Sequence, residues 1–133
     1  MWNLGIRGVT FMVCNTDQQA LDKSPVELKI RLGAEGLGAG NDPENGRRAA
    51  VESLPEIRQH LEESGTRMLF ITAGMGGGTG TGASPVIAKL AKEMGLLTVA
   101  IVTSPLAVEG KIRYEQAFRG IEELRQNTDS LLI

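Results

Sequence analysis

The sequence predicts an α/β fold in three layers, with a mostly parallel sheet and helices on both of its faces. Short apolar runs alternate along the chain with apolar stripes of helical spacing, which is the pattern of consecutive strand–helix–strand units. Polar or glycine-rich clusters follow the predicted strands, as in Rossmann-like sheets that bind ligands at the carboxyl edge of their strands. The 133 residues are enough for one domain with its own core.

Five segments are predicted to be strands. Met68–Ala73 and Leu97–Thr103 are continuously apolar, which suits parallel strands covered on both faces. Val26–Arg31 alternates apolar and charged residues, so it is expected near a sheet edge with one face exposed. Val9–Cys14 is a short run of β-forming residues, and Ser130–Ile133 looks like a last strand.

Helix signals lie between these strands. Asp42 followed by proline is a typical start, with an N-cap before a proline in the first turn. Ser53 has capping-box spacing to an acidic residue and a proline lies between them, so we expect this helix to break near Leu54. Further apolar stripes predict helices through Val86–Met94 and from about Gly110 to Gln126.

The densest glycine run, GMGGGTGTG at residues 74–82, leads from a predicted strand toward a helix. Without Cβ atoms, successive N–H groups can converge on an anion, and a helix start adds partial positive charge. Thr79 and Thr81 add hydroxyl donors; a flexible glycine hinge, the alternative, would leave them unexplained. The run contains no lysine or arginine, so Mg²⁺ would help to offset the charge of a triphosphate.

Four such clusters each follow a predicted strand: Asn15–Asp17, Gly33–Asp42, Gly74–Gly82 and Ser104–Gly110. Parallel strands would bring them to one edge of the sheet, where they would form one phosphate-binding site. The chain lacks the glycine-lysine-Ser/Thr of a Walker loop. It matches the dinucleotide fingerprint weakly and has no carboxylate at the end of the next strand, so a Rossmann-like oxidoreductase is the weaker alternative.

Composition excludes several other classes of protein. The net charge of -2 gives no general attraction to nucleic acid. No apolar run approaches the roughly 20 residues of a membrane span, and the first residues do not resemble a signal peptide. The lone Cys14 cannot form an internal disulfide and is expected to be a buried small hydrophobe. A cytoplasmic location without membrane insertion is the simplest expectation.

The motif GGGTGTG at Gly76–Gly82 is similar to the signature loop of the tubulin/FtsZ superfamily of GTPases. NTD at 15–17, GLGAGNDP at 36–43 and TSPLAVEGKIR at 103–113 resemble further loops of that family, in the same order and spacing. The resemblance is closer to bacterial FtsZ than to eukaryotic tubulin. It implies a guanine nucleotide, GTP or GDP, bound with Mg²⁺.

The resemblance also implies a role for each site residue. The glycine-rich loop would wrap the phosphates, Ala39–Asn41 would sense the terminal phosphate, Glu109 would accept hydrogen bonds from the ribose, and Arg113 would reach the nucleotide. Asp17 and Glu109 could instead be helix-start residues, and Arg113 a solvated helix charge. The implied nucleotide-binding set is Asn15, Asp17, Ala39, Gly40, Asn41, Gly76, Gly77, Gly78, Thr79, Gly80, Thr81, Gly82, Thr103, Pro105, Glu109 and Arg113.

By the same resemblance, residues 1–133 are expected to be a partial GTP-binding domain. They would lack the family's first strand and first glycine-rich loop, and everything after the sixth strand. Trp2 and Leu4 would then belong to a truncated helix. The missing strand would leave a gap between Val9–Cys14 and Met68–Ala73, which direct closure or a strand-completing dimer would relieve.

The full-length family forms cytoskeletal filaments in the bacterial division ring. No catalytic residue is assigned in this chain, because the family's catalytic loop acts on the nucleotide of the neighbouring subunit and is missing here. We therefore expect the chain alone neither to hydrolyse GTP nor to polymerise. A non-catalytic interaction module, which keeps the fold but not the nucleotide, is the alternative function.

Overall fold

The structure is a computed structural model that describes residues 8–133, so Trp2 and Leu4 lie outside the described residues. All strand pairings are parallel, which confirms the α/β class. The elements in chain order are β1 (Met12–Asn15), α1 (Gln18–Lys23), β2 (Leu28–Arg31), α2 (Pro43–Glu63), β3 (Met68–Gly74), α3 (Thr79–Glu93), β4 (Leu97–Thr103), a short 3-10 helix (Ala107–Glu109), α4 (Lys111–Gln126) and β5 (Ser130–Leu132).

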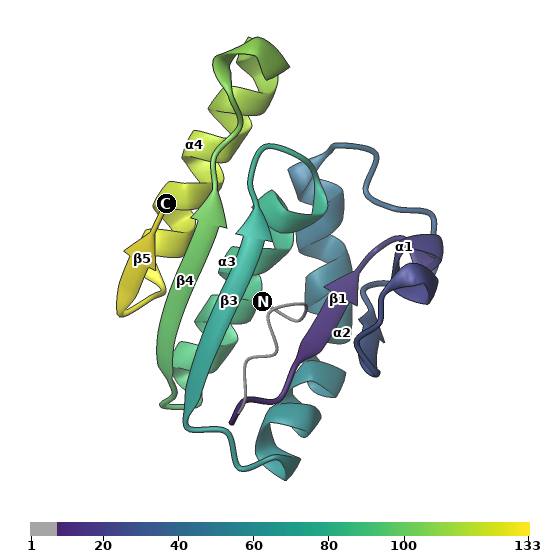
Figure 1. Cartoon of the computed structure of the whole chain (residues 1–133), viewed down its shortest axis with the longest axis vertical. Coiled ribbons are helices and arrows are strands. Elements are labelled where there is room, and N and C mark those ends of the chain that lie inside the picture. Colours follow the sequence, from purple (N-terminus) through teal and green to yellow (C-terminus); the bar gives the residue numbers. More distant parts are fainter. Residues whose placement is uncertain (1–7) are drawn as a thin grey trace.

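The described strands form two sheets, which are separate at the place where the sequence analysis expects a gap. β1 pairs with β2, and β3, β4 and β5 pair in that order. In the described residues β1 and β3 do not pair, so the expected gap between them is not closed directly (Figure 1). The two sheets nevertheless share a core, because Cys14 of β1 and Leu69 of β3 pack on one cluster with Ala50 of α2 and Leu90 of α3.

The helices α2, α3 and α4 lie on one side of the strands (Figure 1). On that side Leu69, Ile71 and Ala73 of β3 are partly buried, whereas Met68 and Phe70 on the other face are 48% and 50% exposed. The continuous apolar run predicted coverage of both faces. The described helices cover one face of β3, so an apolar surface remains open to solvent.

A second cluster of buried residues lies between the three-stranded sheet and the helices α3 and α4. Ala100 and Val102 of β4 pack there with Ala88 of α3, and α4 contributes Ala117 and Leu124. Since α3 supplies residues to both clusters, it is the helix that connects the two halves of the molecule.

The expected break near Leu54 is wrong, because α2 continues through Pro55 to Glu63. The hydroxyl of Ser53 does not cap a new helix. It accepts a hydrogen bond from the Gly33 N–H at 3.1 Å and donates one to the Arg31 carbonyl at 3.3 Å. Burial of the apolar face of α2 on both sides of the proline outweighs the local capping signal.

Helices α2 and α3 pack closely at their first turns. A Cβ atom added to Gly46 would collide with the Gly78 carbonyl, and one added to Gly82 with the Pro43 carbonyl. These two positions therefore need glycine. Their close approach places the start of α2 directly against the glycine-rich loop.

Candidate functional site

The four loops that follow β1, β2, β3 and β4 gather at one edge of the molecule, as predicted (Figure 1). The Gly38 N–H donates to the Thr16 carbonyl at 3.1 Å, and the Met75 N–H donates to the Thr103 carbonyl at 2.9 Å. An antiparallel bridge also joins Asp17 to Leu37. The first loop is therefore tied to the second, and the third to the fourth.

The glycine-rich run is partly loop and partly helix. Gly76 adopts a left-handed φ of 115°, and α3 begins at Thr79, well before the predicted stripe at Val86. Gly78 is the N-cap and provides no side-chain hydrogen bond, so the first N–H groups of α3 have no side-chain cap to satisfy them. The loop thus leads into a helix start without a side-chain cap, a geometry that suits an anion.

Two threonine hydroxyls fix the shape of this loop. The Thr81 hydroxyl accepts a hydrogen bond from the Gly76 N–H at 2.7 Å. The Thr79 and Thr16 hydroxyl oxygens are 2.7 Å apart, and Thr16 is 4% exposed. Sequence reasoning missed Thr16, although it lies between the two residues that were singled out in the NTD motif. Its partner Thr79 is 63 residues away in the chain, so no local sequence signal could have found it.

A cavity of about 240 Å³ opens at this edge. It is bounded by the glycine-rich loop and by the segment that connects β4 to α4. The predicted site residues that line it are Gly77, Gly78, Thr79, Gly80, Thr103, Pro105, Glu109 and Arg113, and Gly74, Met75 and Ser104 line it in addition.

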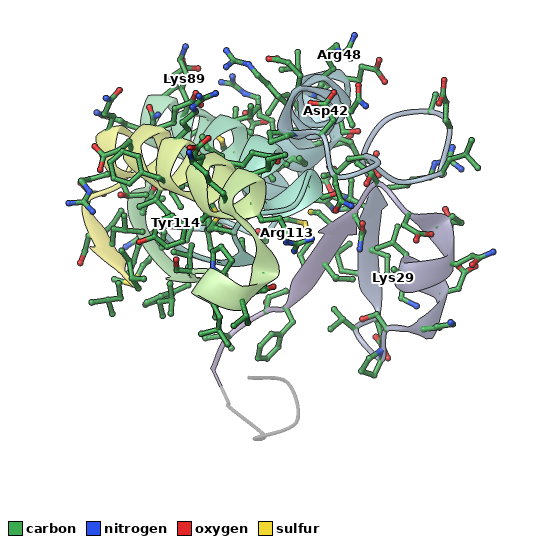
Figure 2. The ribbon with its side chains drawn as sticks, turned by 90° about the horizontal axis from the view of Figure 1, so that it is seen from above. Lys29, Asp42, Arg48, Lys89, Arg113 and Tyr114 are labelled. Atoms are coloured by element: carbon green, nitrogen blue, oxygen red, sulfur yellow. The ribbon has the colours of Figure 1, made fainter. Side chains whose placement is uncertain are left out.

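Glu109 and Arg113 form the wall of the cavity opposite the loop. One carboxylate oxygen of Glu109 accepts from the Leu106 N–H at 2.6 Å, and the other lies 3.9 Å from Arg113 Nε. Arg113 Nε is buried, and no acceptor among the described residues is within hydrogen-bond distance of it. In Figure 2, Arg113 lies near the centre of this edge, whereas Tyr114 lies on the outer side of α4.

Ala39, Gly40 and Asn41 border the glycine-rich loop without lining the cavity. A Cβ atom on Gly78 would come within 2.6 Å of the Ala39 methyl group, and one on Gly77 within 3.6 Å of Asn41 Oδ1. Gly40 and Asn41 both have left-handed φ angles, of 61° and 60°. The segment therefore bends over the end of the loop at which α3 begins.

Five further predicted residues do not line the cavity: Asn15, Asp17, Gly76, Thr81 and Gly82. The Asn15 side chain accepts from the Asp17 N–H at 3.1 Å. The Asp17 carboxylate accepts from the Gln19 N–H at 2.9 Å and is the N-cap of α1. Asp17 is therefore a helix-start residue of α1. The other three shape the loop.

No group of three or more His, Cys, Asp or Glu residues within residues 8–133 could hold a metal ion. In the same residues no helix has the length and apolarity that crossing a bilayer requires. Burial, and secondarily the Glu56 carboxylate, raise the pKa of the Cys14 thiol from 9.0 to about 11. The side chain is thus a neutral part of the core at ordinary pH.

A larger hollow of about 480 Å³ lies away from the glycine-rich loop. Among its lining residues are the carboxylates Glu52 and Glu56 and the guanidinium of Arg31. It lacks a helix start with free N–H groups, so the smaller cavity is the one whose chemistry suits phosphate.

Comparison with known proteins identifies the family. Residues 5–133 match the Tubulin/FtsZ family, GTPase domain. The cell division protein FtsZ of Porphyromonas gingivalis is 54% identical over 136 residues, which cover 100% of this chain and 30% of that protein. The same protein of Bartonella bacilliformis is also 54% identical over 136 residues, covering 100% and 23%. The chain thus spans less than a third of the length of these relatives.

Solved structures agree with the sequence comparison. The empty FtsZ dimer of M. jannaschii superposes with a TM-score of 0.92 at 45% identity, covering 98% of this chain and 38% of that one. GDP-bound monomeric CetZ1 from Haloferax volcanii gives 0.80 at 26% identity, covering 89% and 39%. Because the family match extends over nearly the whole chain, this protein belongs to the Tubulin/FtsZ family and matches its GTPase domain.

Proposed function

We propose that the chain binds GTP or GDP at the carboxyl edge of its strands, with the phosphates on the glycine-rich loop. The observation that carries the proposal is the cavity itself. It faces the start of α3 on one side and Arg113, whose buried Nε has no hydrogen-bond partner among the described residues, on the other. An anionic tail between them would satisfy both. CetZ1, a relative of similar fold, is GDP-bound.

Within this proposal, Gly77–Gly80 contact the phosphates, and Thr81 and Gly82 keep the loop in shape. Ala39–Asn41 lie next to the terminal phosphate. Glu109, half exposed at the cavity wall, accepts hydrogen bonds from the ribose, and Arg113 pairs with phosphate oxygens. Asn15 and Asp17 support the loop from β1.

Mg²⁺ fits this site only as a partner of the nucleotide. The Asp17 carboxylate is already engaged as a helix cap, and Thr79 contributes a hydroxyl rather than a charge. Mg²⁺ commonly keeps several waters and binds through substrate phosphates plus one or two protein oxygens. We therefore propose that the phosphates hold the ion, with the hydroxyl of Thr79 as a candidate ligand.

Binding of fluorescent GTP, GDP and ATP to the 133-residue protein tests the proposal. Arg113→Ala should weaken GTP binding about tenfold, because it removes a charge-assisted contact. Arg119→Ala is the matched control, since Arg119 is exposed on the same helix. Absence of guanine nucleotide binding, or equal affinity for ATP, would contradict the proposal.

We also propose that the chain is part of a longer cytoplasmic GTPase that assembles filaments in cell division, in keeping with its FtsZ relatives. We further propose that the 133 residues by themselves neither hydrolyse GTP nor polymerise, since they span less than a third of the length of these FtsZ relatives. Release of phosphate from GTP above background by the purified chain would contradict this.

Within residues 8–133, β1 pairs only with β2 and β3 only with β4, so each has one unpaired edge, which suggests self-association as a second property. Met68 and Phe70 of β3 are exposed on the face away from α2, α3 and α4, and unpaired strand edges favour added strands. We propose a strand-completing dimer of this chain. Sedimentation analysis should show a dimer that Phe70→Lys weakens, whereas the same change at exposed Val51 of α2 should not. A monomer at all concentrations would contradict it.

A further inference from the structure

We propose that Gln116 is a positioning residue that clamps the segment 36–42 across the cavity and so favours GTP over GDP. The inference rests on the nucleotide site proposed above. Its starting observation is a hydrogen bond between residues 75 positions apart in sequence. The side-chain amide of Gln116 in α4 donates to the backbone carbonyl of Asn41 at 3.0 Å.

The segment 36–42 is firmly attached on the side of α2 and α3. The Ala39 carbonyl accepts from the Asp42 N–H at 3.1 Å and from the Asn45 side-chain amide at 3.2 Å. Ala39 itself is 7% exposed and packs against Gly78. On this side the position of the segment is therefore fixed relative to the glycine-rich loop.

Gln116 links the segment to α4, the opposite side of the cavity. It lies three residues after Arg113, so both side chains leave neighbouring positions on one face of the helix. Figure 2 shows Asp42, the residue after Asn41, on the α2 side of this edge and Arg113 on the α4 side. The hydrogen bond between Gln116 and Asn41 thus connects α4, which carries Arg113 of the cavity wall, to the segment that borders the glycine-rich loop.

The bond acts on the part of the site that would meet the terminal phosphate. Asn41 has a left-handed φ of 60° and lies beside Gly77. Asparagine adopts a left-handed backbone more readily than most residues, and the hydrogen bond from Gln116 fixes the carbonyl of Asn41 in this conformation. Fixing the Asn41 carbonyl therefore holds the segment beside Gly77, at the place that the function proposed above gives to the terminal phosphate, which GDP lacks.

The test compares two substitutions that remove a side-chain amide but keep its length, Gln116→Met and the control Gln126→Met on the exposed end of α4. The loss of one hydrogen bond in the GTP complex should weaken GTP binding about fivefold. Affinity for GDP should not change. Amide hydrogen exchange of residues 36–42 without nucleotide should become faster in Gln116→Met but not in the control.

An unchanged ratio of GTP to GDP affinity in Gln116→Met would overturn the clamp, as would equal losses for the two nucleotides. Unchanged exchange of residues 36–42 would overturn it as well. The failure of the proposed function looks different, because the wild-type chain would then bind neither nucleotide.

Discussion

The two sides of the cavity are built in different ways. The loop side, defined as residues 36–42 and 76–82, is held by backbone contacts at glycines and by the hydrogen bond of 2.7 Å between Thr16 and Thr79. The α4 side, residues 104–113, is held by the half-exposed pair of Glu109 and Arg113 at 3.9 Å. Contacts between backbones leave little room for adjustment, whereas exposed long side chains can turn.

The difference indicates a division of labour in the site. Anion binding by N–H groups depends on their positions relative to one another, so a loop fixed before the ligand arrives avoids the cost of ordering it. The α4 side contributes charge, and charge acts over longer distances and tolerates movement. We therefore expect substitutions beneath the loop side to affect folding, and those on the α4 side to affect ligand binding.

The largest expected effect concerns Cys14 in β1, two residues before Thr16. Burial raises its pKa from 9.0 to about 11, about two pH units, so at pH 8 the folded chain should have about 100-fold less thiolate than the unfolded one. Alkylation by iodoacetamide should be slower by about that factor in buffer than in urea. Similar alkylation rates in buffer and in urea would show that β1 opens readily, which would contradict the rigidity inferred for the loop side.

The same pKa shift has a consequence for stability. The neutral thiol is favoured in the folded state, so its contribution is fully present below pH 9 and is lost as the pH rises toward 11. Urea denaturation of the wild type and Cys14→Ala at pH 8 and pH 11 checks the sign. The wild type should lose more stability than the variant over this interval.

The second prediction concerns the close packing of α2 and α3. Helix propensity alone would make Gly82→Ala stabilising by about 1 kcal/mol. The added methyl group would collide with the Pro43 carbonyl, and overpacking costs about 1–3 kcal/mol. Because the colliding atom belongs to the backbone, the cost should lie at the upper end of this range, so we expect a net loss of about 2 kcal/mol, roughly 30-fold in the folding equilibrium, measured by urea denaturation. Lys89→Ala, at an exposed position of α3, is the control. A gain in stability in Gly82→Ala would show that the two helices can move apart to accommodate the methyl group.

The packing of α2 against α3 is an example of a feature that the sequence could not predict. The glycine run, the Asp42 cap and the strand patterns depend on neighbouring residues, and these gave the α/β class and the loops at one edge. The role of Gly46 depends on the Gly78 carbonyl of another helix, and the path of α2 through Pro55 depends on burial against β2 and α3. Such contacts leave no periodic trace in the sequence.

The site divides in the same way. Glu109 and Arg113 could be placed together from their spacing, and the structure brings both to the cavity. Thr16 and Gln116 could not be assigned to the site from the sequence, because their partners Thr79 and Asn41 are far away in the chain. The carboxylate of Asp17 was ambiguous from sequence, since a capping residue and a phosphate neighbour carry the same signal.

The third prediction tests the hydrogen bond beneath the loop. Thr16→Val keeps the shape of a buried side chain but removes its hydroxyl, so Thr79 loses its 2.7 Å partner. The expected loss is about 1 kcal/mol, roughly fivefold in the folding equilibrium. Thr10→Val, in an exposed position of the same segment, should be neutral in the same urea titration. A neutral Thr16→Val would mean that backbone contacts alone hold the loop.

The smallest effect is expected on the α4 side. Glu109→Gln removes the ion pair with Arg113 but keeps an oxygen that can accept from the Leu106 N–H. Both side chains are 41% exposed, so the stability should change by less than about 0.5 kcal/mol, and high salt should reduce the difference further. A loss above about 1 kcal/mol would show that this side is as rigid as the loop side. A near-zero change leaves Glu109 and Arg113 free to reorient toward a ligand, which is what the proposed binding of ribose and phosphate requires.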